Sequence, residues 1–190
     1  MRVNAIPSRR SAGIRAFRRR GYTLVEMLTT VAVLLIGLGL MVSLARHVRA
    51  SSADDLTKDL LRNLDQAMAR YVAQNGGVPP EVPPFIADQE TTVDEGALAI
   101  RAESNNQATV ALLKKNHVFP AELFQDLSIF YYDGLTVRDA WGSPIVFMPH
   151  MHPAVGMAAK GWFFFSAGPD RQYTTKSDNL YSYELPGVER

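Results

Sequence analysis

The sequence contains no cysteine, and its first 20 residues contain no acidic side chain. Without cysteine the chain has no disulfide framework, no thiolate nucleophile and no Cys-ligated metal site. Seven arginines stand in those first 20 residues, so the other 170 residues carry 13 basic and 19 acidic side chains, a net charge of −6. A basic N-terminal segment before an acidic remainder is not the charge pattern of a nucleic-acid-binding protein. It indicates a topogenic signal followed by a soluble domain.

Charge is also missing from the 19 residues between Met27 and Ala45. As a helix that rises about 1.5 Å per residue, this run is roughly 29 Å long, close to the thickness of a bilayer core. The upstream arginines predict a cytoplasmic N-terminus and a body outside the cytoplasm. The alternatives are a plain signal anchor, a secretory signal peptide cut after Ala45, and a twin-arginine signal at residues 19–20.

None of these alternatives explains Glu26, which lies one turn into the apolar segment. A carboxylate costs up to about 2.5–3.5 kcal/mol at the centre of a membrane helix and less near the interface. A functional role for Glu26 therefore requires a positively charged partner.

Residues 20–27, Arg-Gly-Tyr-Thr-Leu-Val-Glu-Met, resemble the prepilin-type cleavage motif of type IV pilins and type II secretion pseudopilins. The resemblance implies cleavage between Gly21 and Tyr22 by a membrane prepilin peptidase, followed by N-methylation of Tyr22. It also implies that Glu26 neutralises the N-terminal amine of a neighbouring subunit, since two charges that are costly alone in lipid become a pair. Tyr22 stands where the motif usually has Phe, and it keeps the aromatic ring.

Apolar residues continue at steps of mostly three or four beyond Ala45, with charged residues on the opposite face. This period predicts one helix from about Tyr22 to Gln74, membrane-embedded in its first half and amphipathic in its second. Asn75-Gly76-Gly77 predicts its end.

The rest of the chain predicts a small head. A Pro-rich connection over 76–92 precedes a shorter helix at 91–116, whose polar middle, residues 103–107, predicts a break. Three apolar runs then predict strands covered on both faces, at 144–149, 161–167 and 180–185. The predicted fold class is α+β, a long N-terminal helix packed on a small antiparallel three-stranded sheet. The predicted divisions are a leader at 1–21, a transmembrane or filament-core helix at 22–45, its amphipathic continuation at 46–75, and a globular head at 76–190.

Two segments near the C-terminus are similar to the major pseudopilins. Asp139-Ala-Trp-Gly-Ser-Pro144 is similar to their Asp-x-Trp-Gly-x-Pro turn, and residues 165–170, Phe-Ser-Ala-Gly-Pro-Asp, to their Ser-x-Gly-x-Asp loop. This likeness favours the type II secretion branch over a true pilus subunit.

In that branch the loop before the last strand often binds calcium, which implies Asp170, Asp178 and Asn179 as side-chain ligands here. Backbone carbonyls would complete the six to eight oxygens that calcium takes. Arg171 and Lys176 in the same loop oppose a cation. The alternative is a loop closed by Asx turns, with Asp178 as its cap.

The sequence predicts a structural protein and not an enzyme, because it has no nucleophile elbow, no phosphate-binding glycine loop and no zinc signature. The resemblance implies a single-pass inner-membrane pseudopilin with its N-terminus in the cytoplasm and its head in the periplasm. Its expected partners are copies of itself, other pseudopilins, the prepilin peptidase, an assembly ATPase and a membrane platform protein, with no nucleic acid and no cofactor apart from calcium. The rivals are a type IV pilin of a surface or DNA-uptake filament, and a membrane-anchored extracytoplasmic binding protein or enzyme.

Overall fold

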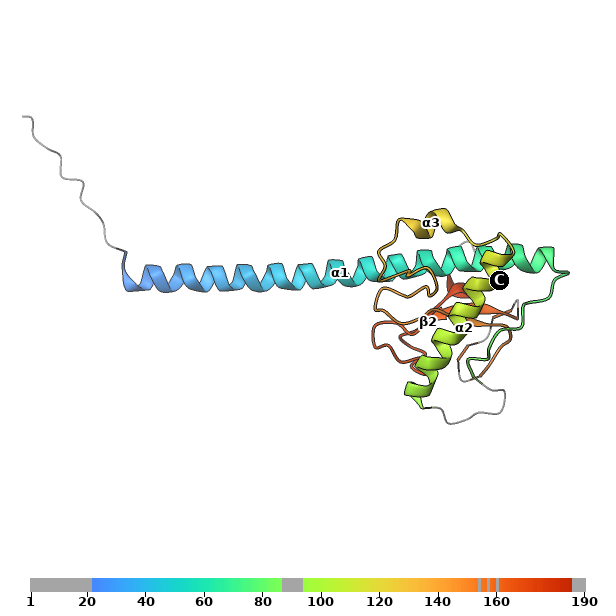
Figure 1. Ribbon diagram of the computed structural model, residues 1–190. Helices are drawn as coiled ribbons and strands as arrows, with labels where there is room; N and C mark the ends of the chain where they lie inside the picture. Colours follow the sequence, from blue (N-terminus) through green and yellow to red (C-terminus); the bar gives the residue numbers. More distant parts are fainter. Residues whose placement is uncertain (1–21, 87–93, 154, 157, 160, 186–190) are drawn as a thin grey trace, which may run out of the picture. The chain divides into compact units, whose positions relative to one another are not determined.

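The computed structural model describes residues 22–86, 94–153, 155–156, 158–159 and 161–185. The chain separates into two compact units, one up to Ala45 and one from Arg46, and helix α1 (Leu24–Gln74) contributes to both. In the first unit, every described side chain is exposed. The second unit is called the head from here on, and it includes the part of α1 that follows Ala45. Its other elements are α2 (Glu95–Lys115), α3 (Ala121–Gln125), β1 (Val146–Met148), β2 (Phe163–Ser166), β3 (Leu180–Tyr181) and the 3₁₀ turn η1 (Ser182–Glu184) (Figure 1).

Helix α1 ends where the glycine pair predicts. Gly76 and Gly77 have φ angles of 74° and 83°, in the left-handed region that glycine adopts without a Cβ clash. The Gly77 N–H donates to the carbonyl of Val72 at 2.9 Å, which satisfies one of the open carbonyls of the last helical turn. The predicted end of the helix at Gln74 is therefore confirmed.

The sheet is antiparallel with the order β1-β2-β3. All residues of β1 and β2 are buried, which confirms that the apolar runs are strands covered on both faces. The third strand is shorter than predicted. After Tyr181 the hydroxyl of Ser182, instead of a backbone carbonyl, accepts the Phe164 N–H of β2, at 3.1 Å. The same hydroxyl donates to Asp65 of α1 at 2.7 Å.

Alternate residues of the strands contribute to two separate apolar clusters. Phe147 and Phe164 face a cluster that includes Leu61 and Met68 of α1. Their neighbours in the strands face a second cluster, in which Phe165 packs on Phe85 with ring centroids 5.5 Å apart. The long helix thus packs on one face of a small antiparallel sheet, and the predicted α+β fold is confirmed.

Helix α2 runs unbroken from Glu95 to Lys115, so the predicted break at 103–107 is wrong. Asn105, in the middle of this polar stretch, is fully buried against β1. Its Oδ1 accepts the Phe147 N–H at 2.9 Å, and its Nδ2 donates to the Phe147 carbonyl at 3.0 Å. The amide therefore occupies the edge of β1 as a neighbouring strand would, and the polarity marks a buried contact rather than a loop.

Candidate functional site

The amino end of α1 is built by hydroxyl groups that serve the helix backbone. The Thr23 Oγ1 accepts the Glu26 N–H at 3.2 Å, as an N-cap does. Further along, the Thr29 hydroxyl donates to the Glu26 carbonyl and the Thr30 hydroxyl to the Met27 carbonyl, each at 2.9 Å. These hydroxyls thus find partners within the helix, which suits a segment surrounded by lipid or by other helices.

Glu26 lies in the first turn of α1 and is the one charged residue between Leu24 and Ala45. Its side chain is exposed, and none of the residues that the structure describes provides a hydrogen bond or ion pair to its carboxylate. The position at a helix N-terminus favours a negative charge. Tyr22 is described and is 74% exposed, whereas Gly21 lies outside the described residues.

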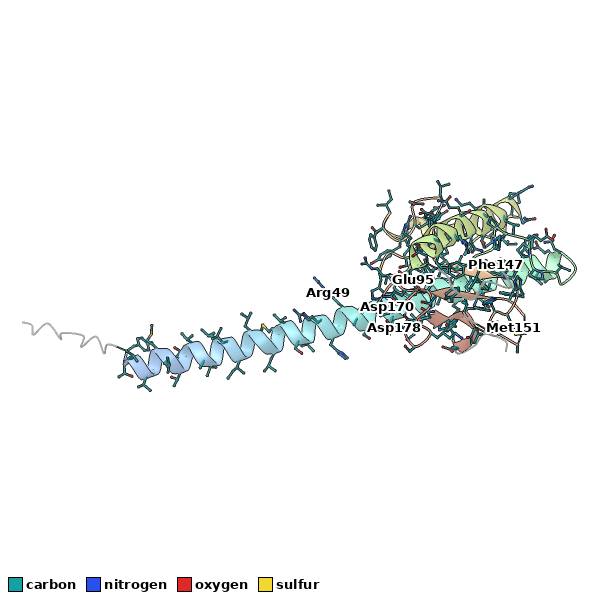
Figure 2. The ribbon with its side chains drawn as sticks, turned by 90° about the horizontal axis from the view of Figure 1, so that it is seen from below. Arg49, Glu95, Phe147, Met151, Asp170 and Asp178 are labelled. Atoms are coloured by element: carbon teal, nitrogen blue, oxygen red, sulfur yellow. The ribbon has the colours of Figure 1, made fainter. Side chains whose placement is uncertain are left out.

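The segment that follows is long and apolar enough to cross a membrane, judged by length and composition alone. Its large apolar side chains are all exposed, and those of Leu34, Leu40 and Met41 are each more than half exposed. Arg46 and Arg49 stand at the end of this segment, and Figure 2 shows the Arg49 side chain projecting from the helix. Such an arrangement fits a membrane helix with basic residues at the interface.

In the head, the two segments that resemble the major pseudopilins meet. Asp139 is fully buried, and its Oδ2 accepts the Ser166 hydroxyl at 2.7 Å. Its Oδ1 accepts the N–H groups of Trp141 and Ser143 at 3.0 and 2.8 Å. Burial raises the pKa of Asp139, although the hydrogen bonds from Ser166 and the backbone oppose this shift.

This contact was not predicted from sequence, although both of its segments were singled out there. Ser166 also accepts the Gly168 N–H at 3.0 Å, so the carboxylate of Asp139 is connected to the start of the loop before β3. The role of the Asp139 carboxylate in this fold is to position that loop and the turn at residues 139–144.

The loop before β3 brings the predicted calcium ligands Asp170 and Asp178 together. The Asp178 Oδ2 accepts the Asp170 N–H at 3.2 Å, and the Asp170 Oδ1 accepts the Gln172 N–H at 2.8 Å. Hydrogen bonds within the loop therefore use one oxygen of each carboxylate. Asn179 is 5% exposed, and its Nδ2 donates to the Tyr173 carbonyl at 2.9 Å. Its Oδ1 has no hydrogen-bond partner among the residues that the structure describes.

The side-chain oxygens of these three residues are too few for a calcium ligand set. Two half-used carboxylates and one amide oxygen supply few of the six to eight oxygens required. Across the described part of the chain, no group of three or more His, Cys, Asp or Glu side chains is placed to hold a metal. Calcium binding by Asp170, Asp178 and Asn179 remains a prediction.

A groove of about 440 Å³ lies beside the Pro-rich connection. It is lined by residues 78–82 and 84–86 and by residues 148–150 at the end of β1, and its titratable lining side chains are Glu81 and His150. Apolar and proline side chains make up most of the wall, which suits packing or the binding of an apolar group more than acid–base chemistry.

Comparison with known families decides the class of the N-terminal segment. The family described as the prokaryotic N-terminal methylation motif matches residues 16–42. The match supports a relation of this segment to the type IV pilins and pseudopilins. The match includes Gly21, Tyr22 and Glu26 but ends before the head, so the pseudopilin-like character of residues 139–144 and 165–170 remains a prediction. No curated protein and no solved structure matches the chain.

Proposed function

We propose that this pilin-like chain is a structural subunit, cut after Gly21 by a prepilin peptidase and assembled through α1 into a filament. The observation that carries the proposal is the methylation motif at residues 16–42, followed by a helix whose single charge before Ala45 is Glu26. Cleavage creates an amine at Tyr22. That amine, on a neighbouring copy, is the positive partner that the exposed carboxylate requires in an apolar environment.

Before assembly, the apolar segment of α1 holds the chain in the inner membrane. The seven arginines of residues 1–20 favour a cytoplasmic N-terminus, and this charge asymmetry supports a periplasmic head. The cut lies before the apolar segment, so the mature chain keeps its membrane helix and loses the leader.

Within the superfamily, we favour a type II secretion pseudopilin over a pilin of a surface or DNA-uptake filament. The support is the junction of Asp139 with Ser166, since it joins the two segments that resemble major pseudopilins. The net negative charge of the chain after residue 20 also speaks against a nucleic-acid-binding surface. A pilin would be found in filaments sheared from the cell surface, whereas a pseudopilin filament stays within the envelope.

The first experiment determines the intact mass and the N-terminal sequence of the chain extracted from membranes. A start at Tyr22, with or without one added methyl group, supports processing by a prepilin peptidase. A start at Met1 means a static anchor, and a start at Arg46 means a secreted soluble domain. Either result contradicts the proposal and favours an anchored or secreted binding protein, for which the groove beside the Pro-rich connection is the place to seek a ligand.

The second experiment compares two variants that remove the same charge. Glu26→Gln is expected to be cleaved normally but to lose most of the multimers that chemical crosslinking captures in the intact cell envelope. Glu122→Gln, on the exposed surface of α3, is the matched control and should assemble like the wild type. Equal assembly of the two variants would refute the role of Glu26.

A further inference from the structure

A third carboxylate enters the loop before β3 from outside. Glu95, the first residue of α2, accepts the Tyr173 N–H through Oε2 and the Thr174 N–H through Oε1, both at 3.2 Å. Its Oε1 also accepts the Thr174 hydroxyl. Glu95 lies at the same end of the head as Asp170 and Asp178 (Figure 2).

These contacts define a site for a negative charge. Two successive backbone N–H groups and a hydroxyl converge on one carboxylate, which is the arrangement of an anion-binding nest. The same carboxylate stands in the first turn of α2, where the helix dipole favours it. The Asp94 side chain caps this helix by accepting the Ala97 N–H at 3.1 Å, so the turn that carries Glu95 is itself well defined.

The loop is also anchored in the core through Tyr173. The phenol hydroxyl donates to the Pro144 carbonyl at 2.9 Å, and the ring lies 5.1 Å from Phe85 and 6.0 Å from Phe165 between centroids. The Tyr173 carbonyl accepts the Asn179 amide. The residue at the middle of the loop is therefore held by its side chain, its N–H and its carbonyl, all through protein groups.

The charges around the loop match this picture. Asp170 and Asp178 are balanced by Arg171 and Lys176 within the loop, and the Lys176 Nζ donates to the Pro153 carbonyl. The buried Asn179 Oδ1 accepts no hydrogen bond from the described residues, and it is one oxygen where calcium takes six to eight. No feature of the loop requires a divalent cation to hold its shape.

We propose that Glu95 is a positioning residue that fastens the loop before β3 to α2, so that the loop keeps its conformation without calcium. The fastening replaces a metal–oxygen contact with a charge-assisted contact between helix and loop. This proposal concerns the architecture of the head, and it stands or falls independently of the filament function proposed above.

The test is amide hydrogen exchange of the full chain in detergent, measured at Tyr173 and Thr174. In Glu95→Gln one acceptor oxygen becomes an NH₂ group that faces a backbone N–H, so we expect exchange at these two amides to accelerate about tenfold or more. Glu103→Gln is the matched control on the same helix. Glu103 pairs with Arg138 at 2.8 Å and accepts no hydrogen bond from the described residues of the loop, so Glu103→Gln should leave the two amides unchanged.

The wild-type chain is measured in parallel with excess calcium and with a chelator. We expect the same exchange and the same melting temperature in both conditions. Slower exchange or a higher melting temperature with calcium would overturn the proposal and support the calcium prediction, as would equal exchange in Glu95→Gln and Glu103→Gln. The comparison of the wild-type chain with and without calcium needs no variant, so it remains decisive even when Glu95→Gln does not fold.

Discussion

The strongest stability prediction concerns Asn106, the second buried amide of α2. Its Oδ1 accepts the Val137 N–H at 2.8 Å, and its Nδ2 donates to the carbonyls of Val137 and Ile145 at 3.0 and 2.5 Å. Val137 and Ile145 are both fully buried, so water does not replace these bonds when the amide is removed. In Asn106→Ala the Val137 carbonyl keeps the Ile145 N–H at 3.0 Å as a partner.

Removal of the amide leaves two buried groups without a hydrogen-bond partner, the Val137 N–H and the Ile145 carbonyl. Each buried polar group left unpaired costs about 1–3 kcal/mol, so Asn106→Ala should lower the free energy of unfolding by about 2–6 kcal/mol. Domains of this size are stable by about 5–15 kcal/mol, so the loss is a large part of the total. Asn106→Leu should be no better, because an apolar side chain of similar size leaves the same two groups unpaired.

Urea unfolding of the full chain in mild detergent measures this loss, with tryptophan fluorescence as the signal. Trp141 and Trp162 both lie in the head, so the fluorescence reports the unfolding of that unit. Ser104→Ala, on the exposed side of the same helix, is the control for helix propensity and should change the stability little. A loss in Asn106→Ala within about 0.5 kcal/mol of the control would show that the amide does not hold the sheet edge.

Four further predictions concern the head. Asp139→Ala should destabilise it by about 3 kcal/mol or more, because three donors lose their acceptor in a buried site, and Asp139→Asn should cost less; equal urea midpoints contradict this. Burial raises the pKa of Asp139, so the free energy of unfolding should fall as pH rises from the ordinary Asp range through the raised value, and a pH series in which Asp139→Asn keeps that slope refutes the assignment. The pH dependence from Asp133 has the opposite sign, because backbone N–H donors, that of Thr136 first, hold its pKa below the ordinary value. Its contribution to stability is present above about pH 4 and is lost as pH falls through the lowered pKa, which NMR titration of the carboxyl group checks. Gly168→Ala should destabilise the loop before β3 far more than Gly161→Ala, because both glycines have positive φ but only at Gly168 would a Cβ lie 2.1 Å from a backbone oxygen; similar melting temperatures for the two variants argue against this steric account.

Sequence patterns predicted the elements whose burial repeats along the chain. Helix α1 was predicted because its apolar residues recur every three or four positions, and the strands because β1 and β2 are covered on both faces. The same reasoning failed at residues 103–107, since it equates polarity with exposure. A buried amide that pairs with a strand edge looks, in sequence, like a polar break in a helix.

The contacts of the head could not be predicted in this way, because they join residues far apart in the chain. Ser166 reaches Asp139 across 27 positions, and Ser182 reaches Asp65 across 117. No local period records such a pair. The segments of Asp139 and Ser166 were singled out by their likeness to the major pseudopilins, but the hydrogen bond between them was not predicted.

By itself, the sequence determined the apolar N-terminal helix, the methylation motif and the place of Glu26, since these depend on an uninterrupted apolar run and on neighbouring residues. The tertiary structure alone decided what holds the loop before β3 and the edge of β1. Hydrogen bonds are short and directional, so which donors and acceptors meet depends on how α2 lies across the sheet. That placement brings Glu95 to the loop and Asn105 to the edge of β1.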